Sequence, residues 1–285
     1  MAVTGSGTQA DPWIVHSYNE LSWAFNQASL GNGVYIKLAN DIDCNDYGTE
    51  FVWGNLSVGY STRQVVFDLD NHTIKNVQIG TNQPMFTFSS GNQCVVKNGK
   101  IRNVFMNGSQ GFCQYTGGLY TFAKLVNISF SANATGVLGY PFHCGFEACA
   151  IYLEGGNSSM NVFNVPYNVS AQMKNTDVLL KDAAGYMLFE NTDYQNIIDS
   201  RIRGKFTGQQ NYLANSGNLF NNCVVDLEYN RGYLTGNSGT NTGVINTDKL
   251  PAGFDTRGMT HVNNQEIING DALRAKGFVV VNVSA

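Results

Sequence analysis

Four aspartates in two short segments are the residues best suited to chemistry. One repeat of 27 residues would align the first pair with the second, and the four residues are Asp41, Asp43, Asp68 and Asp70. Neighbouring strands of a sheet lie about 4.8 Å apart, so carboxylates in this register would suit a retaining glycosidase or a calcium site. We favour the alternative, in which the four carboxylates form an outward polar column and Lys97 in the next repeat reduces the repulsion among them.

Two glycine-rich segments, 110–121 and 232–243, are expected to form long loops that carry aromatic side chains. Tyr offers both contact area and a hydroxyl, so aromatic residues on polar loops suit a sugar or a partner protein. The candidates for glycan or partner binding are Phe112, Tyr115, Tyr120 and Tyr233. We give equal weight to the alternative that these segments are structural bulges whose aromatic side chains fold back onto the solenoid.

The cysteines and histidines predict no metal site and no cofactor. Cys144 and Cys149, with His143 and Glu147 nearby, could bind a metal, but structural zinc sites usually pair cysteines two to four residues apart. Three other cysteines lie in strand-like contexts and are expected to be small core residues. They are Cys44, Cys94 and Cys223.

The elements that must position these residues are short strands in a repeat. Asn or Asp recurs with an apolar residue three positions later, and the pairs are Asn71 and Ile74, Asn98 and Ile101, Asn127 and Phe130, Asn175 and Val178, Asp199 and Ile202, and Asn222 and Val225. The wide step from Asn127 to Asn175 indicates two turns. A period of this length predicts stacked coils, each burying its apolar face against its neighbours.

The composition of the repeat favours strands over helices. The segments are rich in Val, Ile, Phe and Thr, the residues that suit a pleated surface. The 31 Gly suit tight bends, and only five Pro interrupt the chain. About three short strands per turn fit the period, which is a parallel β-helix, and Ile42, Leu69 and Val96 are expected to share one inward column.

The segments that begin at Gly7, Val34 and Val65 resemble the opening of right-handed parallel β-helix proteins of the pectin-lyase-like superfamily. The resemblance implies an all-β, right-handed solenoid with an N-terminal capping helix. The segment from Gly258 is similar to the tail segments of bacteriophage virion appendages, which implies a virion protein and a homotrimer.

Polygalacturonases of this superfamily carry Asn-Thr-Asp, Asp-Asp, Gly-His-Gly and Arg-Ile-Lys motifs. This chain has Asn175-Thr176-Asp177, Asn191-Thr192-Asp193 and Arg201-Ile202-Arg203, but neither Gly-His-Gly nor Asp-Asp. Lyases of the superfamily use Arg or Lys as base beside calcium-binding Asp, which Arg201, Arg203 and Asp199 could imitate. We favour a solvated strand face there, and on balance a protein that is not an enzyme.

One domain is expected over residues 1–285, with an N-terminal cap (1–33), coils (34–257) and a C-terminal cap or assembly segment (258–285). Ser17 and Glu20 form a capping box for a helix that ends at Gly31. A second helix over 263–276 and a strand over 278–283 are expected to close the other end, because an open coil edge would pair with other chains.

Charge and composition exclude some functions. A net charge of -4 with 13% charged residues gives no basic surface for nucleic acid. The sequence contains no apolar stretch that could span a membrane and no secretion signal at its start. The lack of such a signal predicts synthesis in the host cytoplasm, and the resemblance to phage appendages implies a place on the virion surface.

Three functions fit these observations. The first is a virion structural or appendage protein, a head or tail fibre that presents loops to a host-surface polysaccharide and contacts other virion proteins. The second is a polysaccharide lyase or glycoside hydrolase that uses the acid cluster, and the third is a bacterial surface adhesin. We favour the first.

Overall fold

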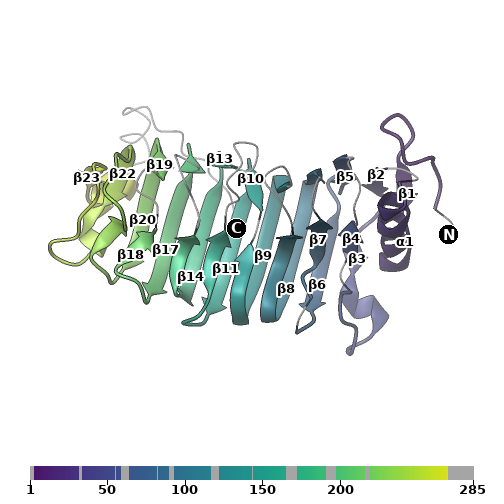
Figure 1. Ribbon diagram of the computed structural model, residues 1–285, viewed down its shortest axis with the longest axis horizontal. Helices are drawn as coiled ribbons and strands as arrows, with labels where there is room; N and C mark the ends of the chain where they lie inside the picture. The colour runs from purple at the N-terminus through teal and green to yellow at the C-terminus, as the bar shows by residue number, and fades with distance from the viewer. Residues whose placement is uncertain are drawn as a thin grey trace.

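The computed structural model shows an all-β parallel solenoid with its strands stacked along one long axis (Figure 1). It describes residues 3–31, 34–54, 56–58, 64–81, 83–89, 93–116, 122–142, 144–164, 172–190, 197–215 and 219–268. Helix α1 (Tyr18–Ser29) lies at the N-terminal end and helix α2 (Asn264–Ile268) follows the last strand. Short 3₁₀ turns span Cys44–Tyr47 and Thr247–Lys249.

The strands of the coils form three faces. The first face contains β1 (Trp13–Val15), β2 (Tyr35–Leu38), β5 (Gln64–Asp68), the starts of β8 (Gln93–Thr116) and β9 (Phe122–Phe142), β10 (Gly145–Glu147), β13 (Met173–Lys174), β16 (Ile197–Ile198) and β19 (Phe220–Asn221). The second contains β3 (Ile42–Asp43), β6 (Thr73–Ile79), the middle of β8 and β9, β11 (Ala150–Gly156), β14 (Asp177–Gly185), β17 (Arg201–Gly208), β20 (Cys223–Tyr229), β22 (Gly243–Asn246) and β23 (Thr260–Val262). The third contains β4 (Leu56–Val58), β7 (Phe86–Ser89), the ends of β8 and β9, β12 (Asn161–Asn164), β15 (Met187–Glu190), β18 (Tyr212–Ala214) and β21 (Tyr233–Thr235).

Apolar residues in register fill the interior. The inward column of the second face runs through Ile42, Ile74, Ile101, Phe130, Ile151, Val178, Ile202, Val225 and Ile245. On the third face, Phe142, Phe163 and Phe189 stack with ring centroids 5.2 and 5.3 Å apart. The core is thus a set of columns in which each coil covers the apolar face of the next.

The predicted Asn repeat forms the corner between the first and second faces. Its members have positive φ, the left-handed conformation that Asn and Asp adopt more easily than other residues with a Cβ. They are Asn71, Asn98, Asn127, Asn175, Asp199 and Asn222, with φ from 48° to 69°. Ala148, with φ 53°, supplies the extra turn expected between Asn127 and Asn175.

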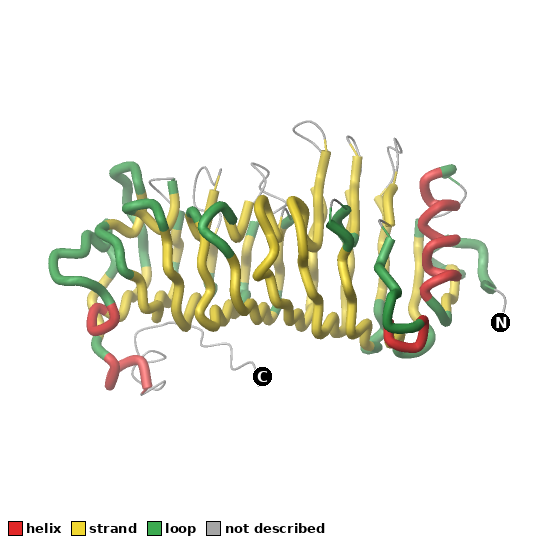
Figure 2. The backbone as a smooth tube through the Cα atoms, turned by 90° about the horizontal axis from the view of Figure 1, so that it is seen from below, coloured by secondary structure: helices red, strands yellow, loops and turns green. Residues whose placement is uncertain are grey.

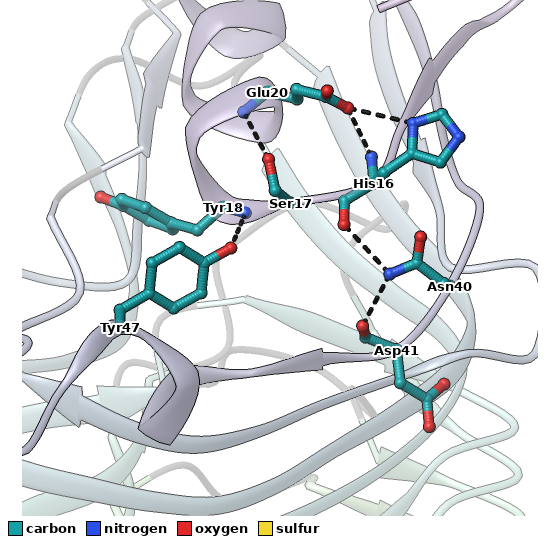
Figure 3. Close-up of polar contacts among 7 residues, drawn as sticks. All are labelled: His16, Ser17, Tyr18, Glu20, Asn40, Asp41 and Tyr47. Atoms are coloured by element: carbon teal, nitrogen blue, oxygen red, sulfur yellow. Dashed lines mark hydrogen bonds and ion pairs between the residues drawn. The ribbon is translucent and has the colours of Figure 1, made fainter. Parts of the chain in front are cut away.

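Helix α1 covers the first coil as predicted. Ser17 caps it by accepting the N–H of Glu20, and the Glu20 carboxylate accepts the N–H of His16 at 2.7 Å (Figure 3). The apolar stripe Leu21, Ala24, Phe25 and Ala28 is buried. In Figure 2 the helix lies across the end of the solenoid, where it covers the open edge that the first coil would expose.

The structure corrects the expected register of the first coils. Ile42 pairs with Ile74 rather than with Leu69, and Val96 pairs with Phe67 on another face. Leu69 is nevertheless fully buried. The error came from assuming a constant repeat of 27 residues, whereas the step from Ile42 to Ile74 is longer because a 3₁₀ turn and a loop follow Asp43.

The expected loops are partly strand. Residues 110–116 continue β8, and β21 begins at Tyr233, because these residues occupy the third-face position of their coils. At the C-terminal end only Asn264–Ile268 of the expected helix is described. The expected strand at 278–283 lies outside the described residues.

Candidate functional site

Three aspartates of the acid cluster pair with a lysine and the fourth contacts a histidine. The backbone register places Lys75 beside Asp43, and it places Asp68 between Lys37 and Lys97. The ion pairs are Lys75 with Asp43 at 3.0 Å, Lys97 with Asp68 at 3.3 Å, Lys37 with Asp70 at 3.0 Å and His72 with Asp41 at 3.3 Å. Lysines therefore stand beside three of the four carboxylates, and the His72 ring stands beside Asp41, so the cluster is not a bare carboxylate pair.

Two of these carboxylates also hold the turns that follow them. Asp43 accepts the N–H of Asn45 at 3.0 Å and the side-chain amide of Asn76 at 2.8 Å, and Asp68 accepts the N–H of Asp70 at 2.9 Å. The bonds to Asp43, with Lys75, lower its pKa, the largest cause being Asn76. A carboxylate whose pKa is lowered stays ionised near neutral pH and is a poor general acid.

Asp41 adjoins the cap of α1, as Figure 3 shows. The Asn40 side-chain amide donates to the carbonyls of His16 at 3.0 Å and Asp41 at 2.8 Å. The Asp41 carboxylate accepts the N–H of Thr73 at 2.9 Å in the next coil. These contacts join the cap, the first corner and the second coil, which is a structural role.

A second charged cluster lies on the outer side of the second face. Asp177 is buried, with a side chain 2% exposed, and it pairs with Arg203 through Nε at 3.1 Å and Nη2 at 2.9 Å. Arg201 lies 3.8 Å from the same carboxylate. This bidentate contact is the strongest geometry for an ion pair between Arg and a carboxylate.

The cluster continues toward the C-terminal end. Arg203 lies beside Asp226 in the next coil. The Asp226 carboxylate contacts Lys249 and the Asn246 amide, each at 2.8 Å. Burial lowers the pKa of Arg201, while Asp177 opposes that shift.

The Asn175-Thr176-Asp177 segment performs structural tasks here. The Thr176 hydroxyl donates to the carbonyl of Lys174 at 3.0 Å, and Ser200 in the next coil repeats this bond to Ile198 at 2.7 Å. Arg201 and Arg203 meet Asp177 rather than the predicted Asp199. Asp199 instead forms the corner and accepts the Asn222 amide at 2.7 Å.

The predicted aromatic candidates divide into two groups. Phe112 and Tyr115 lie in β8, but their side chains and the whole of Tyr120 are outside the described residues. Tyr233 is 42% exposed, and the Arg257 guanidinium lies 5.2 Å from its ring centroid. Of the four side chains, only that of Tyr233 belongs to the described part of the chain, and it stands near the C-terminal end of the solenoid.

The cysteines described in the structure are buried. Burial raises the pKa of the Cys149 and Cys223 thiols to about 12. In the described part of the chain, no three His, Cys, Asp or Glu side chains are grouped as metal ligands. The predicted His143 lies outside that part.

The sequence interpretation missed Asp226, which lies beside Arg203, and also Lys249 and Asn246, which are the partners of Asp226. The signal was present, because Asp177 and Arg201 stand two residues after their corners, and Arg203 and Asp226 stand four residues after theirs. Aligning the coils on their corner residues therefore predicts which outward side chains lie beside one another in neighbouring coils.

No family model matches the chain, and neither curated proteins nor solved structures give a match. Within the described ranges, no helix has the length and apolar character needed to cross a bilayer.

Proposed function

We propose that this protein is a rigid structural component of a bacteriophage virion appendage, a parallel β-helix of the pectin-lyase-like type that presents a surface to host glycans. The observation that carries the proposal is the continuous inward column from Ile42 to Ile245, in which every rung stacks on the next. A solenoid of this kind is stiff because each coil is held by both neighbours.

The surface chemistry supports a passive role. The four aspartates best placed for catalysis are each paired with a lysine or a histidine and engaged in turns or corners. Such a surface has few reactive groups and many amides and hydroxyls, which suits contact with sugars or with other proteins of a particle. The resemblance of the segment from Gly258 to appendage tails supports the virion assignment.

The proposed partners are other virion proteins, two further copies of the chain, and a host-surface polysaccharide. The trimer rests on the same resemblance. The protein would be made in the host cytoplasm and carried on the particle surface.

Particle composition tests the virion assignment. An antibody against the full chain, used for immunogold labelling of purified particles and for blots of their proteins, should detect it on an appendage. Light scattering of the purified chain should give the mass of three copies. Its absence from washed particles would refute the virion assignment, and a monomer would refute the trimer.

One observation favours a second candidate, a polysaccharide lyase. Arg201 is a guanidinium with a lowered pKa beside a buried carboxylate, and lyases of this superfamily use such a base. Purified protein should then cleave uronic-acid polymers with a rise in ultraviolet absorbance, and Arg201→Gln should abolish cleavage. A hydrolase that uses the acid cluster would instead lose turnover in Asp43→Asn or Asp70→Asn.

A further inference from the structure

An open pocket lies on the outer side of the second face, across β8, β9 and β11, which are neighbours in Figure 1. Its volume is about 170 Å³. The residues that line it are Asn103, Val104, Phe105, Ser131, Ala132, Asn133, Tyr152 and Glu154. None of them belongs to the acid cluster or to the Asp177 network.

Phe105 gives the pocket an exposed aromatic surface. Phe105 is 51% exposed and stands in β8 between two irregularities of the pairing with β9, while its neighbours Val104 and Met106 point inward and are buried. An aromatic ring exposed at the pocket offers an apolar face against which a ligand can pack. Tyr152 adds a second, partly buried ring two coils away.

Polar groups with spare hydrogen-bonding capacity surround the ring. The Asn103 amide nitrogen donates to Asn76 at 3.1 Å, and no described residue donates to its side-chain oxygen. The Ser131 hydroxyl accepts the N–H of Asn103 at 3.1 Å, which leaves its own proton to donate. The Asn103 oxygen can therefore accept a hydrogen bond from a ligand, and the Ser131 hydroxyl can donate one.

Among the described residues that line the pocket, Glu154 is the one that carries a charge. The Glu154 carboxylate accepts the Tyr152 hydroxyl at 3.0 Å and pairs with Lys181 at 3.2 Å. Both of its oxygens are therefore engaged, and its charge is matched. An uncharged ligand with hydroxyls fits these groups better than an acidic one.

We propose that this pocket binds one uncharged sugar ring of a glycan chain, with the apolar face of the ring against Phe105 and its hydroxyls at Asn103 and Ser131. The volume is below the roughly 300 Å³ at which pockets for drug-sized molecules begin, which suits a single ring of a longer chain. Phe105, Asn133 and Glu154 lie side by side on successive coils, so the chain would cross the strands along the solenoid axis.

This inference rests on the glycan-binding part of the proposed function, and its test is independent of the particle. The full-length protein is applied to an array of bacterial capsular and O-antigen oligosaccharides, with neutral and uronic-acid members. The dissociation constant for the best neutral binder is then measured by calorimetry. Phe105→Ala should weaken it about tenfold, whereas Phe105→Trp should preserve binding.

Tyr186→Ala is the matched control, because Tyr186 is an aromatic residue of similar exposure, 40%, outside the pocket. Bound glycan should slow amide hydrogen exchange in 103–105 and 131–133 but not near Tyr186. Thermal melts of each variant establish that it is folded.

Three results would overturn the proposal. One is that no array member binds, and another is that Phe105→Ala and Tyr186→Ala weaken binding equally. The third is that only acidic glycans bind and that Arg102→Gln, outside the pocket, abolishes this binding while Phe105→Ala does not. None of these bears on whether the chain is found on particles, so the two proposals can fail separately.

Discussion

Replacing Asp177 with Asn tests whether the buried charge cluster holds adjacent coils together. The variant keeps the shape of the side chain and removes the charge that faces Arg203 and Arg201. Breaking a buried pair costs about 3–5 kcal/mol when the remaining charge has no compensation. The two guanidiniums are 24% and 22% exposed and can turn toward water, so we take the lower end, about 3 kcal/mol.

The assay is hydrogen exchange, because a solenoid opens locally and one unfolding free energy does not describe it. A loss of about 3 kcal/mol raises the opening equilibrium roughly a hundredfold. We expect amide exchange to speed up by that factor in β14 and β17, the strands that carry Asp177 and Arg203. Strands near α1 should exchange as before, because each coil contacts only its neighbours.

Asp182→Asn is the control, since it makes the same chemical change at an exposed site on the same strand. Its side chain is 73% exposed and lies 3.7 Å from Lys205, and such surface pairs contribute about 0–1 kcal/mol. Asn also accepts the positive φ of that position. Equal effects of Asp177→Asn and Asp182→Asn would refute the reasoning, as would full rescue of Asp177→Asn by high salt.

Three further predictions concern the core, the thiols and pH. Leu69→Asp places a charge at a fully buried position and should cost about 3–5 kcal/mol, seen as faster amide exchange in β5 and β8; unchanged exchange there would mean that this site is open to water. The thiols of Cys149 and Cys223, whose pKa values are about 12, should stay unlabelled by a thiol reagent at pH 8 until urea unfolds the chain, and peptide mapping of the label would expose the opposite result. The hydrogen bond from Lys124 is the main cause of the lowered pKa of Glu147, so its stabilisation is present above the ordinary value of 4.5 and is lost as pH falls through the folded pKa. Glu147→Gln should therefore reduce the pH dependence of the melting temperature below pH 4.5, and identical pH curves for both proteins would contradict this.

The sequence was sufficient for the fold because the corner residues are constrained by backbone geometry. Asn127 and Asn222 must adopt positive φ, so their residue type marks the same place in each coil whatever the coil length. The first coils were misaligned because Ile42 was aligned with Val96, and these two residues lie on different faces.

The sites were harder to predict because they depend on which coil follows which. The partner of Asp177 stands 26 residues away, on a strand whose register is set by the corners. The pocket beside Phe105 could not be read from local sequence, since β8 runs for 24 residues through Gly and Asn that would normally indicate turns. Pairing with β6 and β9 decides the strand there, and local preference does not.

The corner column also makes the length of the protein easy to change. Asn175 and Asp199 are successive corners, so a tandem duplication of residues 175–198 would insert one complete rung between two compatible neighbours. Each added rung would extend the rod by about 4.8 Å, the spacing between strands. The length of the rod can therefore be changed in fixed steps, while the cap at α1 and the pocket across β8, β9 and β11 stay unchanged.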